Sequence, residues 1–156
     1  MPAAPKADPV RRNSRVGPLK LPAEGRKGRI PKFPLPKMNV LRWEYEDKRR
    51  FQVLDPESTE ARREQELELW DQLWRTPQAV AWERLGWVRV VARYARLAAA
   101  AEELDKDALS EARQLEDRLG LTPKAMRLLL WEIVADEVGQ QRQSASTGAR
   151  ARIAAV

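Results

Sequence analysis

The feature that most constrains the fold of this chain is the placement of proline. Eight of the eleven prolines lie in the first 40 residues. The same segment holds ten Lys and Arg against two acidic residues, a net charge of +8, whereas the rest of the chain sums to −2. Proline removes backbone donors, and a segment with few apolar side chains cannot offset its ordering entropy. Residues 1–40 are therefore predicted to form a disordered, extended arm.

The basic residues of this arm point to a polyanionic partner. Clustered Lys and Arg attract phosphates and release counterions on binding, so the arm is predicted to contact DNA. A solvated tail that only aids solubility is the alternative. An acidic membrane surface fits less well, because the arm has no amphipathic helix or lipidation signal. The predicted DNA contacts of the arm are Arg11, Arg12, Arg15, Lys20, Arg26, Lys27, Arg29 and Lys32.

Residues 41–56 are expected to connect the arm to a helical domain. Leu41, Trp43 and Tyr45 alternate with charged residues, and the period resumes after a polar stretch at 46–49. This alternation is compatible with a short β-hairpin, although the turn lacks Gly or Asn. A lone hairpin is marginal in water and needs a surface to pack on.

About four helices are predicted in a domain that spans 57–138. Asp55 and Pro56 start the first, which runs to about residue 75. A second helix is expected at 77–104 after a Thr76 cap, a third at 107–119, and a fourth from Thr122 to about 138, with Gly120 ending the third. The predicted fold class is thus all-α, with a flexible tail at 139–156.

The residue types present argue against an enzyme. The chain has no His and no Cys, which supply most zinc ligands, nucleophiles and general bases. Gly25 and Gly28 are followed by prolines and not by a helix, so no phosphate-binding loop is expected. We therefore expect no catalytic residue, no metal and no cofactor. No apolar run is long enough for a membrane span, so a cytoplasmic protein without a membrane partner is expected.

One segment has the features of a helix-turn-helix. The predicted helix at 107–119, the turn at Gly120 and the second helix that starts at Thr122 follow one another as in that motif. Lys124 and Arg127 would then face the groove of DNA. The competing interpretation is packing or subunit contact, because the second helix is apolar on most sides.

Six tryptophans are unusual beside two Phe and two Tyr. A helical part of about 80 residues buries only roughly 60% of its unfolded surface, and Trp is enriched among interface anchors. Self-association is therefore predicted to bury part of this apolar surface. The residues assigned to the subunit interface are Trp70, Trp74, Val80, Trp87, Val91 and Trp131.

Three stretches of the chain are similar to a known family. They read RVGPLKLPAEGRKG at 15–28, LWRTPQAVAWERLGWVRVVARYARL at 73–97 and QLEDRLGLTPKAM at 114–126. Taken together and in this order, they resemble the small subunit of the terminase of tailed bacteriophages, in the form common in actinobacterial phages. The similarity covers most of residues 11–130, and the combination of the three is more specific than any one of them.

The resemblance implies a DNA-packaging protein without catalytic activity. Such a protein would recognise viral double-stranded DNA in the host cytoplasm and assemble as a homo-oligomeric ring. It would deliver the DNA to the terminase large subunit, which holds the ATPase and the nuclease. Two other functions stay open. One is a dimeric helix-turn-helix protein of regulatory or chromatin type, and the other is a structural protein whose basic arm binds an acidic protein.

Overall fold

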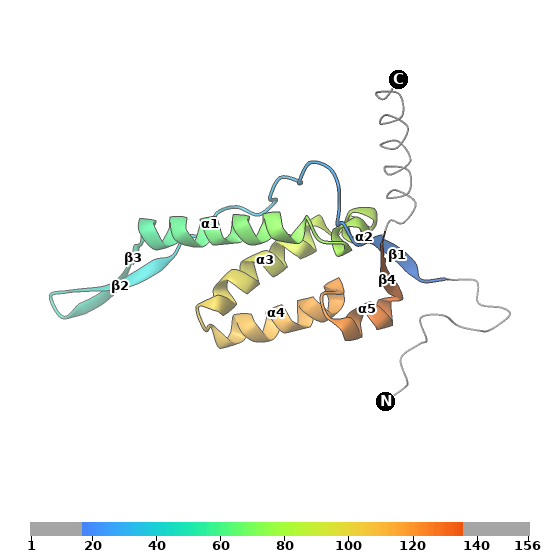
Figure 1. Ribbon diagram of the computed structural model, residues 1–156. Helices are drawn as coiled ribbons and strands as arrows, with labels where there is room; N and C mark the ends of the chain where they lie inside the picture. The colour runs from blue at the N-terminus through green and yellow to red at the C-terminus, as the bar shows by residue number, and fades with distance from the viewer. Residues whose placement is uncertain (1–16, 136–156) are drawn as a thin grey trace, which may run out of the picture.

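A computed structural model of the chain describes residues 17–135 and shows a mixed fold of helices and small sheets (Figure 1). The elements are β1 (Leu19–Pro22), β2 (Leu41–Glu46), β3 (Arg49–Leu54), α1 (Pro56–Leu73), α2 (Gln78–Leu85), α3 (Val88–Glu102), α4 (Lys106–Leu119), α5 (Pro123–Leu129) and β4 (Trp131–Val134). The predicted all-α class is wrong, because two pairs of strands accompany the helices.

The ends of several helices follow from local sequence. The Asp55 carboxylate accepts a hydrogen bond of 3.1 Å from the Ser58 backbone N–H at the start of α1. The Thr122 hydroxyl oxygen accepts one of 3.1 Å from Ala125 at the start of α5. Gly120 ends α4 with a φ of 73°, the left-handed conformation that glycine adopts most readily. These three predictions are confirmed.

The helix predicted at 77–104 is in fact two helices. Gly86 takes a φ of 68° and ends α2, and α3 begins at Val88. The sequence pattern suggested that the helix continues through Gly86 at a small cost in free energy. In the structure Gly86 instead caps the C-terminus of α2. The predicted Thr76 cap is also wrong. Its hydroxyl donates a 2.7 Å hydrogen bond back to the Leu73 carbonyl, and α2 has no side-chain cap.

The predicted hairpin is present as β2 and β3, which pair antiparallel from Leu41 opposite Leu54 to Glu46 opposite Arg49. Asp47 and Lys48 form the two-residue turn, with φ values of 47° and 64°. Positive φ at both positions is what a tight hairpin requires, and Asp and Lys reach it here without Gly or Asn. In Figure 1 the hairpin projects past the start of α1, away from the helical body.

The prediction of a disordered arm is wrong for residues 17–40. β1 pairs in parallel with β4, from Leu19 beside Trp131 to Pro22 beside Val134. The predicted fourth helix therefore does not continue to 138. It ends at Leu129, and Leu130 turns the chain into β4 with a φ of 55°. Residues 1–16 of the arm and the predicted tail at 139–156 lie outside the described residues.

The N-terminal segment supplies part of the core. Leu21 and Phe33 are buried among tryptophans of α1 and α2. Aromatic rings meet edge to face along the series Phe33, Trp70, Trp74 and Trp82, with centroid distances of 5.1, 5.3 and 6.2 Å. Small residues of α3, namely Ala92, Ala95 and Ala99, are buried where its neighbours pack against it. Apolar burial of this kind is the main stabilising term of a small domain.

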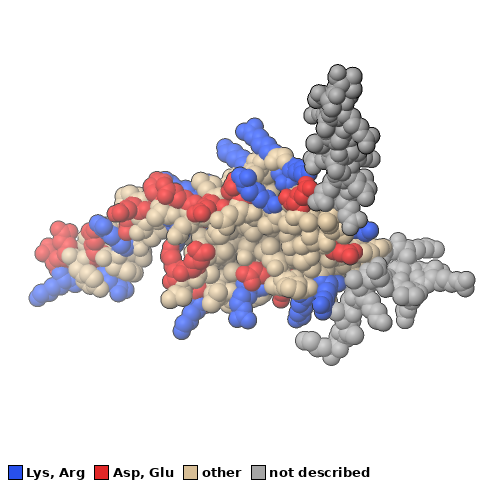
Figure 2. All heavy atoms as spheres, viewed as in Figure 1, with Lys and Arg blue, Asp and Glu red and all other residues tan. Residues whose placement is uncertain are grey.

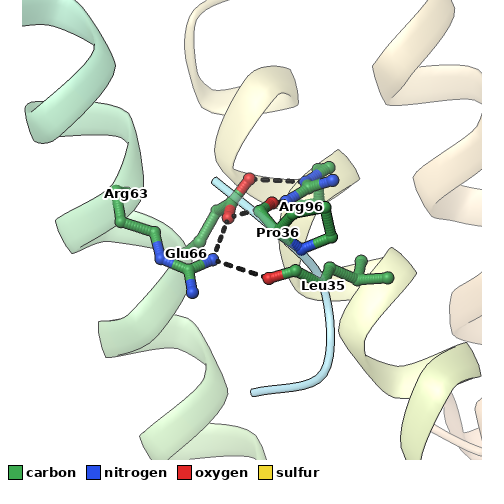
Figure 3. A network of polar contacts seen from close by, with 5 residues as sticks. All are labelled: Leu35, Pro36, Arg63, Glu66 and Arg96. Atoms are coloured by element: carbon green, nitrogen blue, oxygen red, sulfur yellow. Dashed lines mark hydrogen bonds and ion pairs between the residues drawn. The ribbon is translucent and has the colours of Figure 1, made fainter. Parts of the chain in front are cut away.

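A buried carboxylate fastens the same segment to two helices (Figure 3). Glu66 of α1 is only 1% exposed and pairs with Arg63 at 3.0 Å and Arg96 of α3 at 2.7 Å. The two guanidinium groups also donate to backbone carbonyls of the N-terminal segment, Arg63 to Leu35 and Arg96 to Pro36. The network joins α1, α3 and the N-terminal segment. The guanidinium groups of Arg63 and Arg96 are therefore engaged by groups of the chain itself.

Candidate nucleic-acid interface

The loop that follows β1 carries four of the predicted DNA contacts. Its path is set by Gly25, which has a φ of +80°. A Cβ at this position would lie 1.9 Å from the backbone oxygen of Arg75. The next residue, Arg26, donates its backbone N–H to the Thr76 carbonyl at 3.3 Å. Glycine at 25 therefore lets the loop lie directly against the end of α1.

Arg26 fastens this loop to α2. Its Nε and Nη2 donate to the two carboxylate oxygens of Glu83 at 2.9 and 2.7 Å, and Nη1 donates to the Arg29 carbonyl at 3.1 Å. The hydrogen bonds from Arg26 hold the pKa of Glu83 below its ordinary range. The Arg26 side chain is only 9% exposed. Its predicted role as a phosphate contact is not supported, since its donors are already engaged.

The other cations of the loop face outward. Lys27 forms an ion pair with Glu24, and Arg29 and Lys32 are exposed. With Trp74 and Arg75, residues 26–30 line a hollow of about 560 Å³. Arg75 is held beside it by Asp71 at 2.7 Å. Three of these cations are thus paired with carboxylates, and Arg29 and Lys32 are the exposed ones of the set for which no ion pair forms among the described residues.

A second basic surface lies at the turn between α4 and α5. Lys124 and Arg127 are exposed on α5, whereas Ala125 between them is buried. The helix is short and its apolar continuation, including Trp131, belongs to β4. The apolar character that counted against a DNA-facing helix therefore belongs in part to a strand, whereas Met126, Leu128 and Leu129 lie on α5. In the view of Figure 2, Lys and Arg side chains project from two opposite edges of the helical body.

Of the remaining predicted contacts, Lys20 lies among the described residues. Lys20 is exposed on β1, where its neighbour across the parallel pair is Glu132. Arg11, Arg12 and Arg15 lie outside the described residues.

The predicted subunit interface is mostly core. Trp70, Trp74, Val91 and Trp131 are buried within the single chain, so assigning them to an exposed interface is wrong. The other two, Val80 and Trp87, are half-buried. The error follows from treating residues 1–40 as disordered, because β1 and Phe33 cover apolar surface that the helices alone would leave exposed.

The three stretches that carry the terminase resemblance pack against one another. The Trp82 indole N–H donates to the Leu119 carbonyl at 2.9 Å, and the Gln78 amide donates to the Gly120 carbonyl at 3.3 Å. The Arg26–Glu83 ion pair joins the first stretch to the second. A Cβ on Gly120 would meet the Trp131 ring at 2.5 Å, so this turn also packs without free space.

Sequence reasoning missed two surfaces. One is the exposed aromatic face of the hairpin, for which the alternation at 41–45 was the available signal. The other is a groove between α3 and α4 with Arg93 and Arg118 on its rim. No sequence pattern predicted that groove, since its residues are brought together only by helix packing.

The described residues show neither a metal-binding cluster nor a membrane-spanning helix. No group of three or more acidic side chains among residues 17–135 is arranged to hold a metal ion. None of the helices described is long and apolar enough to cross a membrane. Comparisons with protein-family models, curated proteins and solved structures found no match.

Proposed function

We propose that this chain is a non-catalytic DNA-binding protein that acts as a small terminase subunit. In that role it binds viral double-stranded DNA, associates with itself and presents the DNA to the terminase large subunit in the host cytoplasm. The observation that carries the proposal is the convergence of the three terminase-like stretches, linked by Arg26–Glu83 and Trp82–Leu119. Stretches so far apart in the sequence are expected to pack together if their resemblance reflects a shared fold.

The distribution of charge supports a nucleic-acid partner. Two of these stretches adjoin exposed cations, which are Arg29 and Lys32 after the first and Lys124 and Arg127 in or beside the last. All four are borne by backbone that is fixed by packing, so binding to phosphates orders their side chains but costs little backbone entropy. Phosphate contacts of this kind position a protein on DNA without reading its sequence.

A second candidate is the dimeric helix-turn-helix regulator. It is favoured by the α4–Gly120–α5 arrangement, whose second helix exposes Lys124 and Arg127. That helix spans only Pro123–Leu129 and runs directly into β4. A reading helix that presents several side chains to base edges needs more exposed length than this one offers. The packaging function is therefore favoured.

The test is the salt dependence of duplex DNA binding, measured by fluorescence anisotropy. Each phosphate contact changes the slope of log affinity against log salt by roughly 0.9. Arg29→Ala with Lys32→Ala and Lys124→Ala with Arg127→Ala are each expected to flatten the slope by up to about 1.8. Deletion of residues 2–16, which removes Lys6, Arg11, Arg12 and Arg15, is expected to flatten it further.

The matched control is Arg84→Ala with Lys106→Ala, which removes two exposed cations from α2 and α4, outside both basic surfaces. This variant is expected to retain the slope of the wild type. Loss of sequence preference in the Lys124 and Arg127 variant, with unchanged behaviour of the other variants, would favour the regulator. Absence of duplex binding at about 50 mM salt, where phosphate-driven binding is strong, would contradict the whole proposal.

A further inference from the structure

The hairpin exposes a face on which apolar side chains outnumber polar ones, and within residues 17–135 the Arg50 guanidinium partly covers it, 3.9 Å from the centroid of the Trp43 ring. Residues directly opposite in an antiparallel pair lie on one face, so Leu41, Trp43 and Tyr45 share a face with Leu54. All four are about half exposed or more. A two-stranded hairpin is only marginally stable in water. Exposed apolar surface on such an element is typical of a protein interface.

The tip of this hairpin combines an aromatic ring with free carboxylates. Tyr45 is 73% exposed, the highest exposure of any aromatic side chain in the described part of the chain. Glu46 and Asp47 follow it, both exposed and neither paired within residues 17–135. The acids of the hairpin lie on β2 and at the first turn position, and Lys48 and Arg49 lie at the second turn position and on β3. The β2 edge of the tip is therefore acidic, whereas the β3 edge is basic, with Arg50 directly opposite Tyr45.

A groove with the opposite character lies between α3 and α4. It is a hollow of about 300 Å³ whose apolar floor is formed by Trp87, Val90, Leu115 and Leu119. Arg93 and Arg118 are exposed on its rim, and neither has a hydrogen-bond or ion-pair partner among the described residues. No carboxylate lines the groove. Two unpaired guanidinium groups beside an apolar floor fit a ligand that joins a carboxylate to a large apolar group.

We propose that the tip of the β2–β3 hairpin of one copy inserts into the α3–α4 groove of a second copy. The Tyr45 ring fills the hollow, and the carboxylates of Glu46 and Asp47 pair with Arg93 and Arg118. In Figure 1 the hairpin and the α2 and α5 end of the molecule lie at opposite ends. The contact therefore joins copies head to tail, and such a heterologous contact closes into a ring or extends as a filament.

The chemistry of both surfaces favours a second copy over a nucleic acid. Phosphates could pair with Arg93 and Arg118, but they would leave the apolar floor of Trp87 and Leu115 and the exposed Tyr45 ring without a partner. The match between tip and groove needs no DNA. The contact supplies the self-association that the proposed function includes, whereas DNA binding is tested separately by its salt dependence, so a failure of one result can be told from a failure of the other.

The experiment measures self-association of purified, nuclease-treated protein by analytical ultracentrifugation from about 1 to 100 μM, a range in which specific protein contacts are detected. The tip variant is Tyr45→Ser with Glu46→Arg, and the groove variant is Arg93→Glu with Arg118→Glu. Each is expected to weaken self-association by about thirtyfold or more, as loss of an interface anchor does. Leu104→Ser, which changes an exposed leucine outside both surfaces, is the control and is expected to match the wild type.

Mixing the two variants provides the decisive result. The tip variant keeps an intact groove and the groove variant keeps an intact tip, so an equimolar mixture is expected to form a one-to-one dimer that grows no further. A monomeric wild type, variants that assemble like the wild type, or variants that do not pair in the mixture would each overturn the proposal. Circular dichroism checks the fold of each variant. If the groove variant folds poorly, Arg93→Gln with Arg118→Gln replaces it.

Discussion

The indole N–H of Trp82 in α2 donates a 2.9 Å hydrogen bond to the backbone carbonyl of Leu119, the last residue of α4. Both residues are fully buried. The last carbonyls of a helix have no partner within the helix, and a buried one without a partner costs free energy. Trp82 supplies that partner from a segment that lies 37 residues earlier in the chain.

Replacement of Trp82 by Phe removes this donor while keeping an aromatic ring. The Leu119 carbonyl would then be buried without a partner, so the free energy of unfolding is expected to fall by about 1–3 kcal/mol. Urea unfolding followed by circular dichroism measures the change. Trp43→Phe is the control, because Trp43 is 50% exposed on the hairpin, and it is expected to shift stability by less than about 0.5 kcal/mol.

Gly25 and Gly86 have similar left-handed backbone conformations, but a Cβ would meet other atoms only at Gly25. Alanine substitutions at the two positions therefore distinguish the cost of a steric clash from the cost of the backbone conformation. Gly86 has a φ of +68° and open space where a Cβ would lie, so Gly86→Ala is expected to cost roughly 1–2 kcal/mol for left-handed backbone alone. Gly25 has a φ of +80°, and its Cβ would lie 1.9 Å from the Arg75 oxygen. Gly25→Ala is expected to cost more than about 4 kcal/mol. Equal midpoints of thermal unfolding for the two variants would contradict the placement of the loop.

Glu66 offers a test of the link between the N-terminal segment and the helices. Glu66→Gln leaves Arg63 and Arg96, each about 20% exposed, without a counter-charge. Removal of one partner from a buried ion pair typically costs about 3–5 kcal/mol. Glu64→Gln on an exposed position of the same helix is the matched control and should leave the unfolding free energy nearly unchanged. Limited proteolysis near Leu35 would report whether the segment detaches first.

The raised pKa of Tyr94 leads us to expect that the free energy of unfolding falls at alkaline pH. Its burial, and then the negative charge of Glu116, to which its hydroxyl donates at 3.1 Å, raise the pKa of Tyr94 to about 12. The unfolded chain ionises this phenol near its ordinary pKa of about 10. The protonated folded state is therefore favoured fully below about pH 10, and this contribution is lost as the pH rises toward 12.

The measurement is the tyrosinate absorbance of a Tyr45→Phe variant, in which Tyr94 is the one tyrosine that remains. Its midpoint is expected near pH 12 in the folded protein. A midpoint near pH 10 would show that the phenol is solvated. Tyr94→Phe is expected to lose the part of the alkaline decrease in stability that comes from this group.

Short-range signals predicted much of the local structure. Asp55, Gly120 and Thr122 marked helix ends correctly because a cap depends on a few neighbouring atoms. The alternation at 41–45 likewise predicted the hairpin, since its partner strand follows after a two-residue turn. The candidate DNA contacts Lys124 and Arg127 were predicted on the same basis, as exposed cations just after a cap.

The sequence by itself therefore determined where α1 and α5 begin, where α4 ends, and where the hairpin lies. Tertiary structure alone decided that β1 pairs with β4, that Trp70, Trp74 and Trp131 are core, and that Arg26 binds Glu83. The physical reason is the distance along the sequence between the interacting residues. A cap or tight turn is stabilised by atoms a few residues away, whereas a parallel pair of strands more than 100 residues apart gains free energy only when the helices between them have packed.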